Sequence, residues 1–265
     1  RPAERSATKV VDRSADRTRR RLETSQLQAS PFGVCSQPTQ PHRPAERSAT
    51  LRLPLTCYLH PASLMFDLVV GSGNAHKVAE LRALLPADRI RLTPLSDLPN
   101  AIEVDETGST FAENARLKAV EQAKHLGRWV LAEDSGLSVD ALGGRPGVLS
   151  ARYAGKHGDD QANNRRLLDE LAGVPDERRG AAFCCFICLA DPQGQVQIEV
   201  DDFCRGRIAH EAAGDGGFGY DPLFIIPEYH LTFAQLGLAV KNVLSHRSRA
   251  LRKLLPRLLD VIAPS

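Results

Sequence analysis

The chain has 265 residues, of which 42% are hydrophobic and 25% are charged. This composition supplies enough apolar surface for a sizeable core and excludes a wholly disordered chain or a fibre. The longest apolar runs, such as Phe66 to Val70, are far shorter than the roughly 18 to 20 residues that span a bilayer. We therefore expect no membrane segment.

Six cysteines in a chain of this length match neither a secreted disulfide scaffold nor a paired zinc site. A reducing, cytoplasmic location is therefore expected. The Cys-x-x-Cys motif from Cys185 to Cys188 falls inside a predicted strand, where its two cysteines face opposite ways. We expect buried core cysteines there, and not a metal or redox site.

The first 64 residues differ from the rest in charge and in pattern. They contain 11 Lys and Arg against 5 Asp and Glu, whereas the whole chain, with 34 against 32, has a net charge of only +2. The octapeptide Arg-Pro-Ala-Glu-Arg-Ser-Ala-Thr occurs at residues 1–8 and again at 43–50, and the only methionine is Met65. We expect Met65 to be the natural start, residues 1–64 to be a disordered basic extension that is not native, and residues 65–265 to form one domain. The alternative is an organelle-targeting or nucleic-acid-binding arm.

Hydrophobic periodicity and capping signals predict interleaved strands and helices, followed by a hairpin. The predicted strands are Phe66–Val70, Trp129–Ala132, Ala181–Ala190 and Gln195–Asp201. The predicted helices follow Asn74, Thr110 and Asp160, and a last helix runs from about Arg247 to Ile262 with a kink at Pro256. The second strand is expected to end at the polar group that starts with Glu133. This order predicts an α/β fold with a mixed sheet and a cleft.

A glycine turn joins the first strand to the first helix, with the sequence Ser72, Gly73, Asn74, Ala75, His76 and Lys77. Glycines let a polyanion approach the backbone, free N–H groups at a helix start point outward, and Lys77 adds a positive charge. The segment favours phosphate binding, although it lacks the Gly-Lys-Ser/Thr ending of a P-loop. An ordinary strand-to-helix turn is the alternative.

Two acidic pairs are candidate metal ligands. Asp105 and Glu106 stand in a polar loop before the second helix, and Glu133 and Asp134 directly follow an apolar strand. Carboxylates at a strand end lie where α/β folds bind ligands, so the two pairs could share a magnesium ion that also binds phosphates. The alternative for Asp105 and Glu106 is that they only solvate a loop.

A glycine-rich loop from Gly214 to Asp221 is a candidate nucleoside contact. Its small residues leave the ring of Phe218 or Tyr220 free to stack on a base. Asp221 could accept hydrogen bonds from the base or the ribose. A purely structural turn is the alternative.

Three basic residues stand before and at the start of the last helix, namely Lys241, His246 and Arg247. They could supply the cations and donors that phosphates and a base carbonyl require. Taken alone, such a group is more often a solvated surface, so this hypothesis depends on the other motifs.

Together these groups resemble the inosine triphosphate pyrophosphatase family, the non-canonical purine nucleoside triphosphate (dITP/XTP) pyrophosphatases. The resemblance covers about residues 66 to 260. The matching pieces are Ser72 to Lys77, Glu106 to Phe111, Glu133 to Leu137, Leu142 to Gly147, Ser150 to Tyr153, Gly216 to Pro222 and Ser245 to Arg247.

The resemblance implies a homodimeric, magnesium-dependent hydrolase that cleaves ITP, dITP or XTP between the α- and β-phosphates. It also implies an elongated mixed β-sheet flanked by helices, with the site in a cleft between two lobes. By this resemblance Glu106 and Asp134 bind Mg²⁺, and Asp134 is also the catalytic base. The implied substrate-binding residues are Ser72, Gly73, Asn74, Ala75, His76, Lys77, Ser135, Phe218, Gly219, Tyr220, Asp221, Lys241, His246 and Arg247.

Two positions depart from the family pattern. Ser72 stands where threonine is usual, and Glu133 stands where aspartate is common in bacterial members. Serine keeps the hydroxyl group, so we expect little change there. Glu133 is one methylene longer than aspartate, which leaves its share in metal binding open.

Three other functions compete with this hypothesis. A related pyrophosphatase for modified pyrimidines is disfavoured by His246, Arg247 and the Phe218 loop. A nucleotide sensor is disfavoured by the carboxylates, which a polyanion-binding protein does not need without a metal. A nucleic-acid-binding protein rests only on the basic residues 1–64, because the rest of the chain is acidic and would repel a phosphate backbone. We therefore expect a purine nucleotide as the partner, and no stable binding to nucleic acid.

Overall fold

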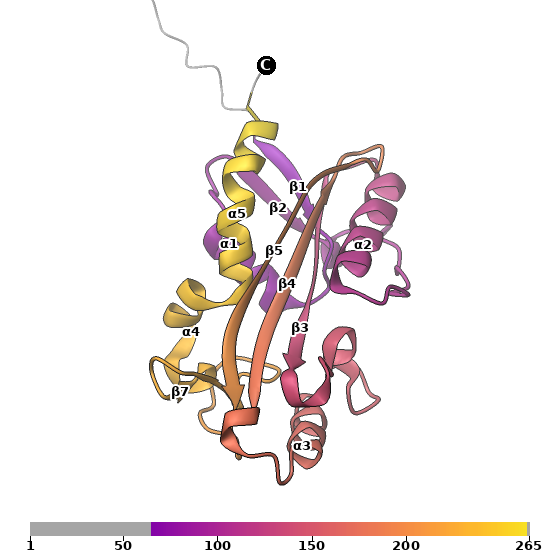
Figure 1. Cartoon of the computed structure of the whole chain (residues 1–265). Helices are drawn as coiled ribbons and strands as arrows, with labels where there is room; N and C mark the ends of the chain where they lie inside the picture. The colour runs from indigo at the N-terminus through magenta and orange to yellow at the C-terminus, as the bar shows by residue number, and fades with distance from the viewer. Residues whose placement is uncertain (1–64, 264–265) are drawn as a thin grey trace, which may run out of the picture. The chain divides into compact units, whose positions relative to one another are not determined.

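The computed structural model describes residues 65–263 (Figure 1). The expectations for residues 1–64 lie outside this range. Of the helices within it, none is both long enough and apolar enough to cross a membrane.

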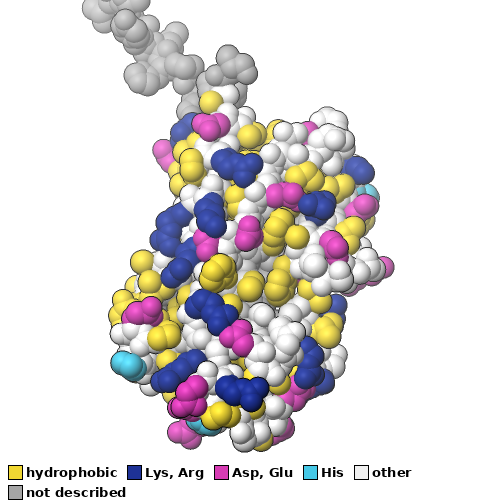
Figure 2. All heavy atoms as spheres, viewed as in Figure 1, with side chains coloured by type: hydrophobic (Ala, Val, Ile, Leu, Met, Phe, Trp, Pro, Cys, Tyr) yellow, Lys and Arg dark blue, Asp and Glu magenta, His cyan; other side chains and the backbone are white. Residues whose placement is uncertain are grey.

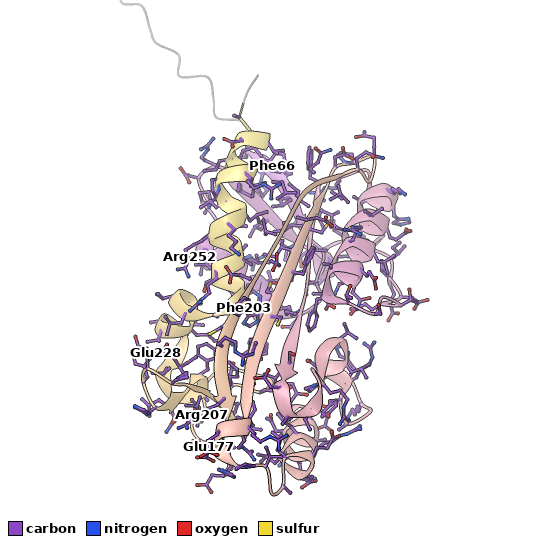
Figure 3. The ribbon with its side chains drawn as sticks, viewed as in Figure 1. Phe66, Glu177, Phe203, Arg207, Glu228 and Arg252 are labelled. Carbon is purple, nitrogen blue, oxygen red and sulfur yellow. The ribbon has the colours of Figure 1, made fainter. Side chains whose placement is uncertain are left out.

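A single mixed sheet of seven strands organises these residues, in the order β2-β1-β3-β4-β5-β6-β7. The strands are β1 (Phe66–Val70), β2 (Ile90–Pro94), β3 (Val130–Val139), β4 (Gly180–Ala190), β5 (Val196–Ile208), β6 (Phe224–Ile226) and β7 (Leu231–Thr232). β1 is parallel to β2 and β3, and every pair from β3 onward is antiparallel. Phe66, at the start of β1, and Arg207, near the end of β5, lie toward opposite ends of the sheet (Figure 3). The predicted mixed sheet is confirmed.

Helices cover both faces of the sheet (Figure 1). They are α1 (Ala75–Leu84), α2 (Phe111–Leu126), α3 (Asp160–Glu170), α4 (Phe233–Leu244) and α5 (His246–Val261). α1 and α5 share one hydrophobic cluster with β1, β4 and β5, whereas α2 packs its alanines against the other face of β1, β3 and β4. A further cluster joins α3 and α4 to the far ends of β3, β4 and β5. The core therefore lies in two regions of one sheet. The first two clusters lie on opposite faces near β1, and the third lies near α3 and α4.

Local signals set the starts of the helices that the sequence predicts. Asn74 caps α1 by accepting from the backbone N–H groups of His76 and Lys77. Thr110 and Glu113 form both bonds of a capping box at the start of α2, as predicted. Such side chains satisfy N–H groups that have no partner inside the helix.

Three features differ from the sequence-based expectation. β3 does not end at Ala132 but continues to Val139, because β4 pairs with it along its whole length. β5 likewise extends to Ile208. The last helix is confirmed, since α5 continues through Pro256 as predicted. β2, α4, β6 and β7 were not predicted; two of them have only two or three residues, and α4 contains a non-helical residue at Gly237.

Candidate active site

The turn between β1 and α1 leaves open space beside its backbone. A Cβ atom added at Gly73 would have no heavy atom within 4 Å, so a ligand can approach the chain there. The sequence predicted free N–H groups at this helix start, but those of His76 and Lys77 are occupied. Oδ1 of Asn74 accepts from them at 3.0 and 3.3 Å. Ser72 in turn accepts from the N–H of Asn74 at 3.2 Å. The turn therefore offers open space and Lys77, and its first N–H groups are occupied by side chains.

Glu106 and Asp134 converge on the same ammonium group. Nζ of Lys118, on α2, lies 3.3 Å from Oε1 of Glu106 and 3.1 Å from Oδ1 of Asp134. Asn114, one helical turn earlier, donates to Oδ2 of Asp134 at 3.2 Å. Burial raises the pKa of the Asp134 carboxyl, and the charge of Lys118 opposes this rise. Two carboxylates that are 28 positions apart in the sequence are thus held at one point.

Glu133 points to the opposite face of β3, because successive side chains of a strand alternate. Nε and Nη2 of Arg247 donate to its two carboxylate oxygens at 2.7 and 2.8 Å, and Nζ of Lys77 lies 3.1 Å from Oε1. These cations hold the pKa of Glu133 well below its usual range despite its complete burial. Arg247 also pairs with Glu80 of α1. Glu133 is therefore engaged in a buried ion cluster and does not join Glu106 and Asp134.

The two aromatic rings of the glycine-rich loop differ in exposure, because Phe218 is partly exposed and Tyr220 is buried. Phe218 stacks on His76, with 5.1 Å between ring centroids, and Nζ of Lys241 lies 4.0 Å from the Phe218 centroid. Tyr220 is buried and donates its hydroxyl to the carbonyl of Ser150 at 2.9 Å, so it supports the loop from below. Asp221 accepts from Lys241 at 2.6 Å and from the N–H of Phe218 at 2.9 Å. These two hydrogen bonds to Asp221 fix the position of the Phe218 ring in the loop.

His246 contributes a polar atom that is buried without a partner. Its ring stacks on Phe183, with 5.0 Å between centroids, and its Nδ1 has no hydrogen-bond partner among the described residues. Burial lowers the pKa of the imidazole well below its ordinary value, so the ring is neutral. A buried polar atom without a partner is costly unless a ligand satisfies it.

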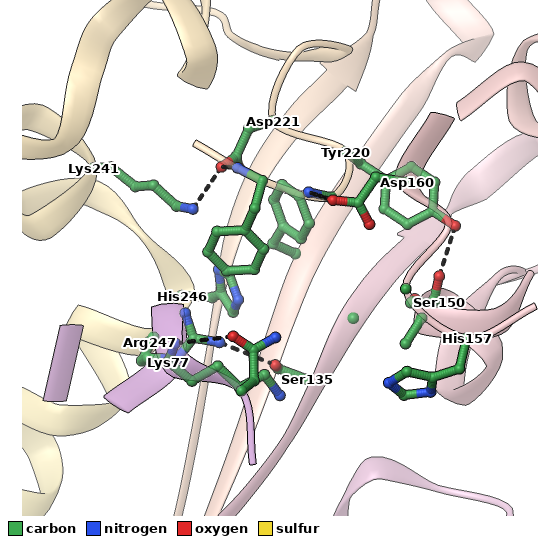
Figure 4. Close-up of a pocket in the computed structure, with 17 residues that line it drawn as sticks. Lys77, Ser135, Ser150, His157, Asp160, Tyr220, Asp221, Lys241, His246 and Arg247 are labelled. Atoms are coloured by element: carbon green, nitrogen blue, oxygen red, sulfur yellow. Dashed lines mark hydrogen bonds and ion pairs between the residues drawn. The ribbon is translucent and has the colours of Figure 1, made fainter. Parts of the chain in front are cut away.

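Two adjoining pockets contain these groups. The inner pocket, of about 130 Å³, is lined by the Phe218 loop, Lys241, His246 and Arg247 (Figure 4). The outer pocket, of about 650 Å³, is lined by the glycine turn, Glu106, Lys118 and Asp134. The residues common to both linings are Asn74, Lys77, Ser135, Ala151, His157 and Gly158. The two pockets therefore meet and form one continuous cleft.

Most of the predicted site residues line this cleft, and a few do not. Ala75 lines neither pocket, and His76 lines a separate apolar pocket beside Phe218. Asp105 is exposed and also lines neither pocket. For Asp105, the alternative of a residue that solvates a loop fits the structure.

A family model described as the Ham1 family matches residues 68–257. The chain belongs to the Ham1 family. A dITP/XTP pyrophosphatase of Rhodopirellula baltica is 64% identical over 198 residues, which cover 75% of this chain and 95% of that protein. A dITP/XTP pyrophosphatase of Mycobacteroides abscessus is 46% identical over 198 residues, covering 74% of this chain and 96% of that protein.

Solved Ham1 structures share the fold. The Ham1 protein of Staphylococcus aureus superposes with a TM-score of 0.67 at 38% identity, covering 74% of this chain and 99% of that chain. A HAM1 protein of Coxiella burnetii gives a TM-score of 0.68 at 39% identity, covering 74% of this chain and all of that chain. The α/β fold inferred from the sequence is therefore confirmed as a Ham1 fold.

Several polar residues in or behind the Ham1 cleft were not predicted from the sequence. Asn114, Lys118 and Gln122 are spaced four residues apart along α2, beside the apolar row of Ala115, Ala119 and Ala123. A polar row that repeats at the helical period next to a buried row is a detectable signal. Glu80 carried no comparable signal, because its partners Lys241 and Arg247 lie more than 150 residues away.

Proposed function

We propose that this Ham1 chain hydrolyses dITP, XTP and ITP to the nucleoside monophosphate and pyrophosphate. The relatives named dITP/XTP pyrophosphatase support this activity, because the chain covers 95% and 96% of the length of two of them. The observation that carries the proposal is the convergence of Glu106 and Asp134 in a pocket that is also lined by the glycine turn. Carboxylates beside an open, basic turn suit a triphosphate that brings a metal ion.

The carboxylates fit a magnesium ion. No group of three or more His, Cys, Asp or Glu side chains among residues 65–263 is arranged to hold a metal by itself. Mg²⁺ is usually bound by one or two carboxylates together with substrate phosphates and water, and Glu106 and Asp134 face one cation position, where the ammonium group of Lys118 lies in this structure. Glu106 and Asp134 would hold the ion, which would neutralise phosphate charge when bound.

The chain's own residues supply the remaining requirements of the reaction. Lys77, at the glycine turn, and Lys118, beside Asp134, provide positive charge in the outer pocket. Asp134 is the base that accepts a proton from the attacking water, and its partly buried position makes its carboxylate more basic than a free one. Asn114 fixes the orientation of this carboxylate through the bond to Oδ2. The α-phosphate would then lie close to both cations and to the catalytic base.

The inner pocket selects the purine base of the nucleotide. Phe218 lines this pocket, and the unpartnered Nδ1 of His246 is the donor for a 6-oxo group. The three nitrogens of the Arg247 guanidinium already donate to Glu133, Glu80 or Ser135. Adenine carries an amino donor at that position, so ATP would leave a buried donor facing another donor. We expect kcat/KM for ATP to be roughly a hundredfold below that for ITP.

One assay tests the activity and its selectivity. Pyrophosphate release is measured with ITP, dITP, XTP, GTP and ATP in the presence of Mg²⁺, and again after removal of Mg²⁺ with a chelator. We expect release from the first three nucleotides, little from ATP, and none without the metal. Absence of release from ITP would refute the activity, whereas equal rates with ITP and ATP would refute only the donor argument.

We also propose a cellular role and a location for the enzyme. It would remove non-canonical nucleotides from the pool before they enter DNA or RNA. We place it in the cytoplasm, where that pool exists and where thiols such as Cys185 stay reduced. Basic and acidic side chains are interspersed on the face seen in Figure 2, which disfavours stable binding to a phosphate backbone.

We also propose a homodimer and a division of the chain into two parts. Light scattering of the purified protein tests the dimer. Residues 65–265 carry the activity in this proposal, and residues 1–64 take no part in it. ITP hydrolysis by a chain that begins at Met65 should equal that of the full chain, and a large loss would show that the preceding residues contribute.

A further inference from the structure

The two pockets meet between two walls that come from different parts of the chain. Asn74, Lys77 and Ser135 form one wall of the junction, and Ala151, His157 and Gly158 form the other. On the proposed function, the base occupies the inner pocket and the β- and γ-phosphates occupy the outer one. The sugar and the α-phosphate then lie at the junction, within reach of both walls.

The segment that carries His157 is held in place by the interior of the protein. Asn163, which is only 2% exposed, accepts from the N–H of Ala154 at 2.7 Å and donates to the carbonyl of Ala151 at 3.3 Å. The N–H of Gly158 donates to the same carbonyl at 2.8 Å, and Gly158 has a φ of 76° that favours glycine. The backbone on both sides of His157 is therefore anchored.

The imidazole of His157 is exposed and lies at the open side of the inner pocket, toward Ser135 (Figure 4). Figure 4 draws no hydrogen bond or ion pair between it and the other residues of that lining. The two acids that follow it along the chain are engaged with backbone N–H groups. Asp159 accepts from Ala162 at 3.0 Å, and Asp160 accepts from Gly219 at 2.6 Å. The ring is therefore available to a ligand.

Charge at the junction identifies the ligand group. A phosphate at the junction lies near the carboxylates of Glu106 and Asp134, whose two negative charges share the single ammonium group of Lys118. Lys77 provides one compensating cation, but it is shared with Glu133 at 3.1 Å. A donor on the opposite wall would hold the other side of the phosphate, and an imidazole N–H is such a donor.

We propose that His157 is a substrate-contacting residue that donates a hydrogen bond to the α-phosphate of the bound nucleotide. This inference rests on the proposed function for the position of the nucleotide. In this proposal, the segment opposite the glycine turn helps to hold the α-phosphate, at which hydrolysis takes place.

The test compares inhibitors that differ only in this phosphate. The probes are inosine monophosphate, which retains the α-phosphate, and inosine, which lacks it, each measured as a competitive inhibitor of ITP hydrolysis. In His157→Ala, we expect inhibition by the monophosphate to weaken about tenfold, while inhibition by inosine stays within about twofold. His157→Gln, which keeps a side-chain N–H donor, should recover part of the loss.

A neighbouring residue provides the control. Lys156 lies in the same segment and lines neither pocket, so Lys156→Ala should leave both inhibition constants unchanged. Equal weakening of both inhibitors in His157→Ala, or no change in either, would overturn the proposal while the parent enzyme still hydrolyses ITP. Failure of the parent enzyme to release pyrophosphate would instead refute the function on which the inference rests.

Discussion

Asp134 is the side chain on which the proposed chemistry depends, and its replacement by asparagine separates binding from turnover. Asparagine keeps the size of the side chain and can still contact Lys118 and Asn114, but it accepts no proton from water. We expect Asp134→Asn to lower kcat by at least about a hundredfold. Binding of ITP, measured by calorimetry under conditions without turnover, should change only a few-fold.

Asp105 offers a matched control for this substitution. It lies in the same loop as Glu106, but it is exposed and lines neither pocket. Asp105→Asn makes the same chemical change and should leave kcat within about twofold. Near-normal turnover in Asp134→Asn would remove the assignment of this residue as the base.

Single residues also show what the sequence could and could not predict about the site. Gly73, Asn74 and Lys77 belong to one continuous turn, so a phosphate-binding role could be predicted for them from the sequence. Lys118 is different, because its role follows from two carboxylates that approach it from separate segments. Its position on a buried polar row of α2 was visible in the sequence, whereas its partners depend on the packing of α2 against β3.

At the scale of elements, α2 links a local signal to the site. Thr110 accepts from the N–H of Glu113 at 3.2 Å, and this cap starts the helix that carries Asn114 and Lys118. We expect Thr110→Ala to lower the free energy of unfolding by about 1 kcal/mol, as measured by urea denaturation. Thr110→Ser keeps the accepting oxygen and should recover most of it; equal losses in both variants would show that the hydroxyl does not cap the helix.

The strand β3 shows why some elements escape prediction. The residues from Glu133 to Gly136 are polar and end in glycine, so they are typical of a loop. They remain in the strand because β4 pairs with all of them and because Arg247, 114 residues away, neutralises Glu133. A Cβ at Gly136 would lie 2.3 Å from Oγ of Ser150, so the glycine permits close packing there and does not end the strand. Such stabilisation is long-range and leaves no local pattern.

At the scale of the whole molecule, one long sheet brings the two halves of the site together. The parallel strands β1 and β2 end near the glycine turn, whereas β3 continues past them and carries Asp134 and Ser135 into the cleft. Interleaved helices and a later hairpin were enough to predict a mixed sheet. The positions of β6, β7 and α4, which support the Phe218 loop, depend on contacts among short segments and were not predictable.

The packing of the whole molecule also predicts how its stability responds to alkaline pH. Burial raises the pKa of Cys188 to about 12 and that of Cys204 to about 11, from 9.0 for a free thiol. Burial and a hydrogen bond to Glu170 raise the pKa of Tyr153 to about 12, from 10.0. Between about pH 9 and 12 the folded chain therefore binds more protons than the unfolded chain, so the free energy of unfolding must fall as the pH rises through this window.

Urea denaturation at about pH 8 and about pH 10.5 measures this fall. Alanine fits both thiol positions in size, so the double variant Cys188→Ala with Cys204→Ala removes two of the responsible groups at the cost of some stability at both pH values. Its loss between the two pH values should be smaller than that of the parent protein, because fewer groups release protons on unfolding. If the parent protein is equally stable at both pH values, these thiol and phenol groups are not buried in their neutral form in solution, because such burial requires the free energy of unfolding to fall as the pH rises.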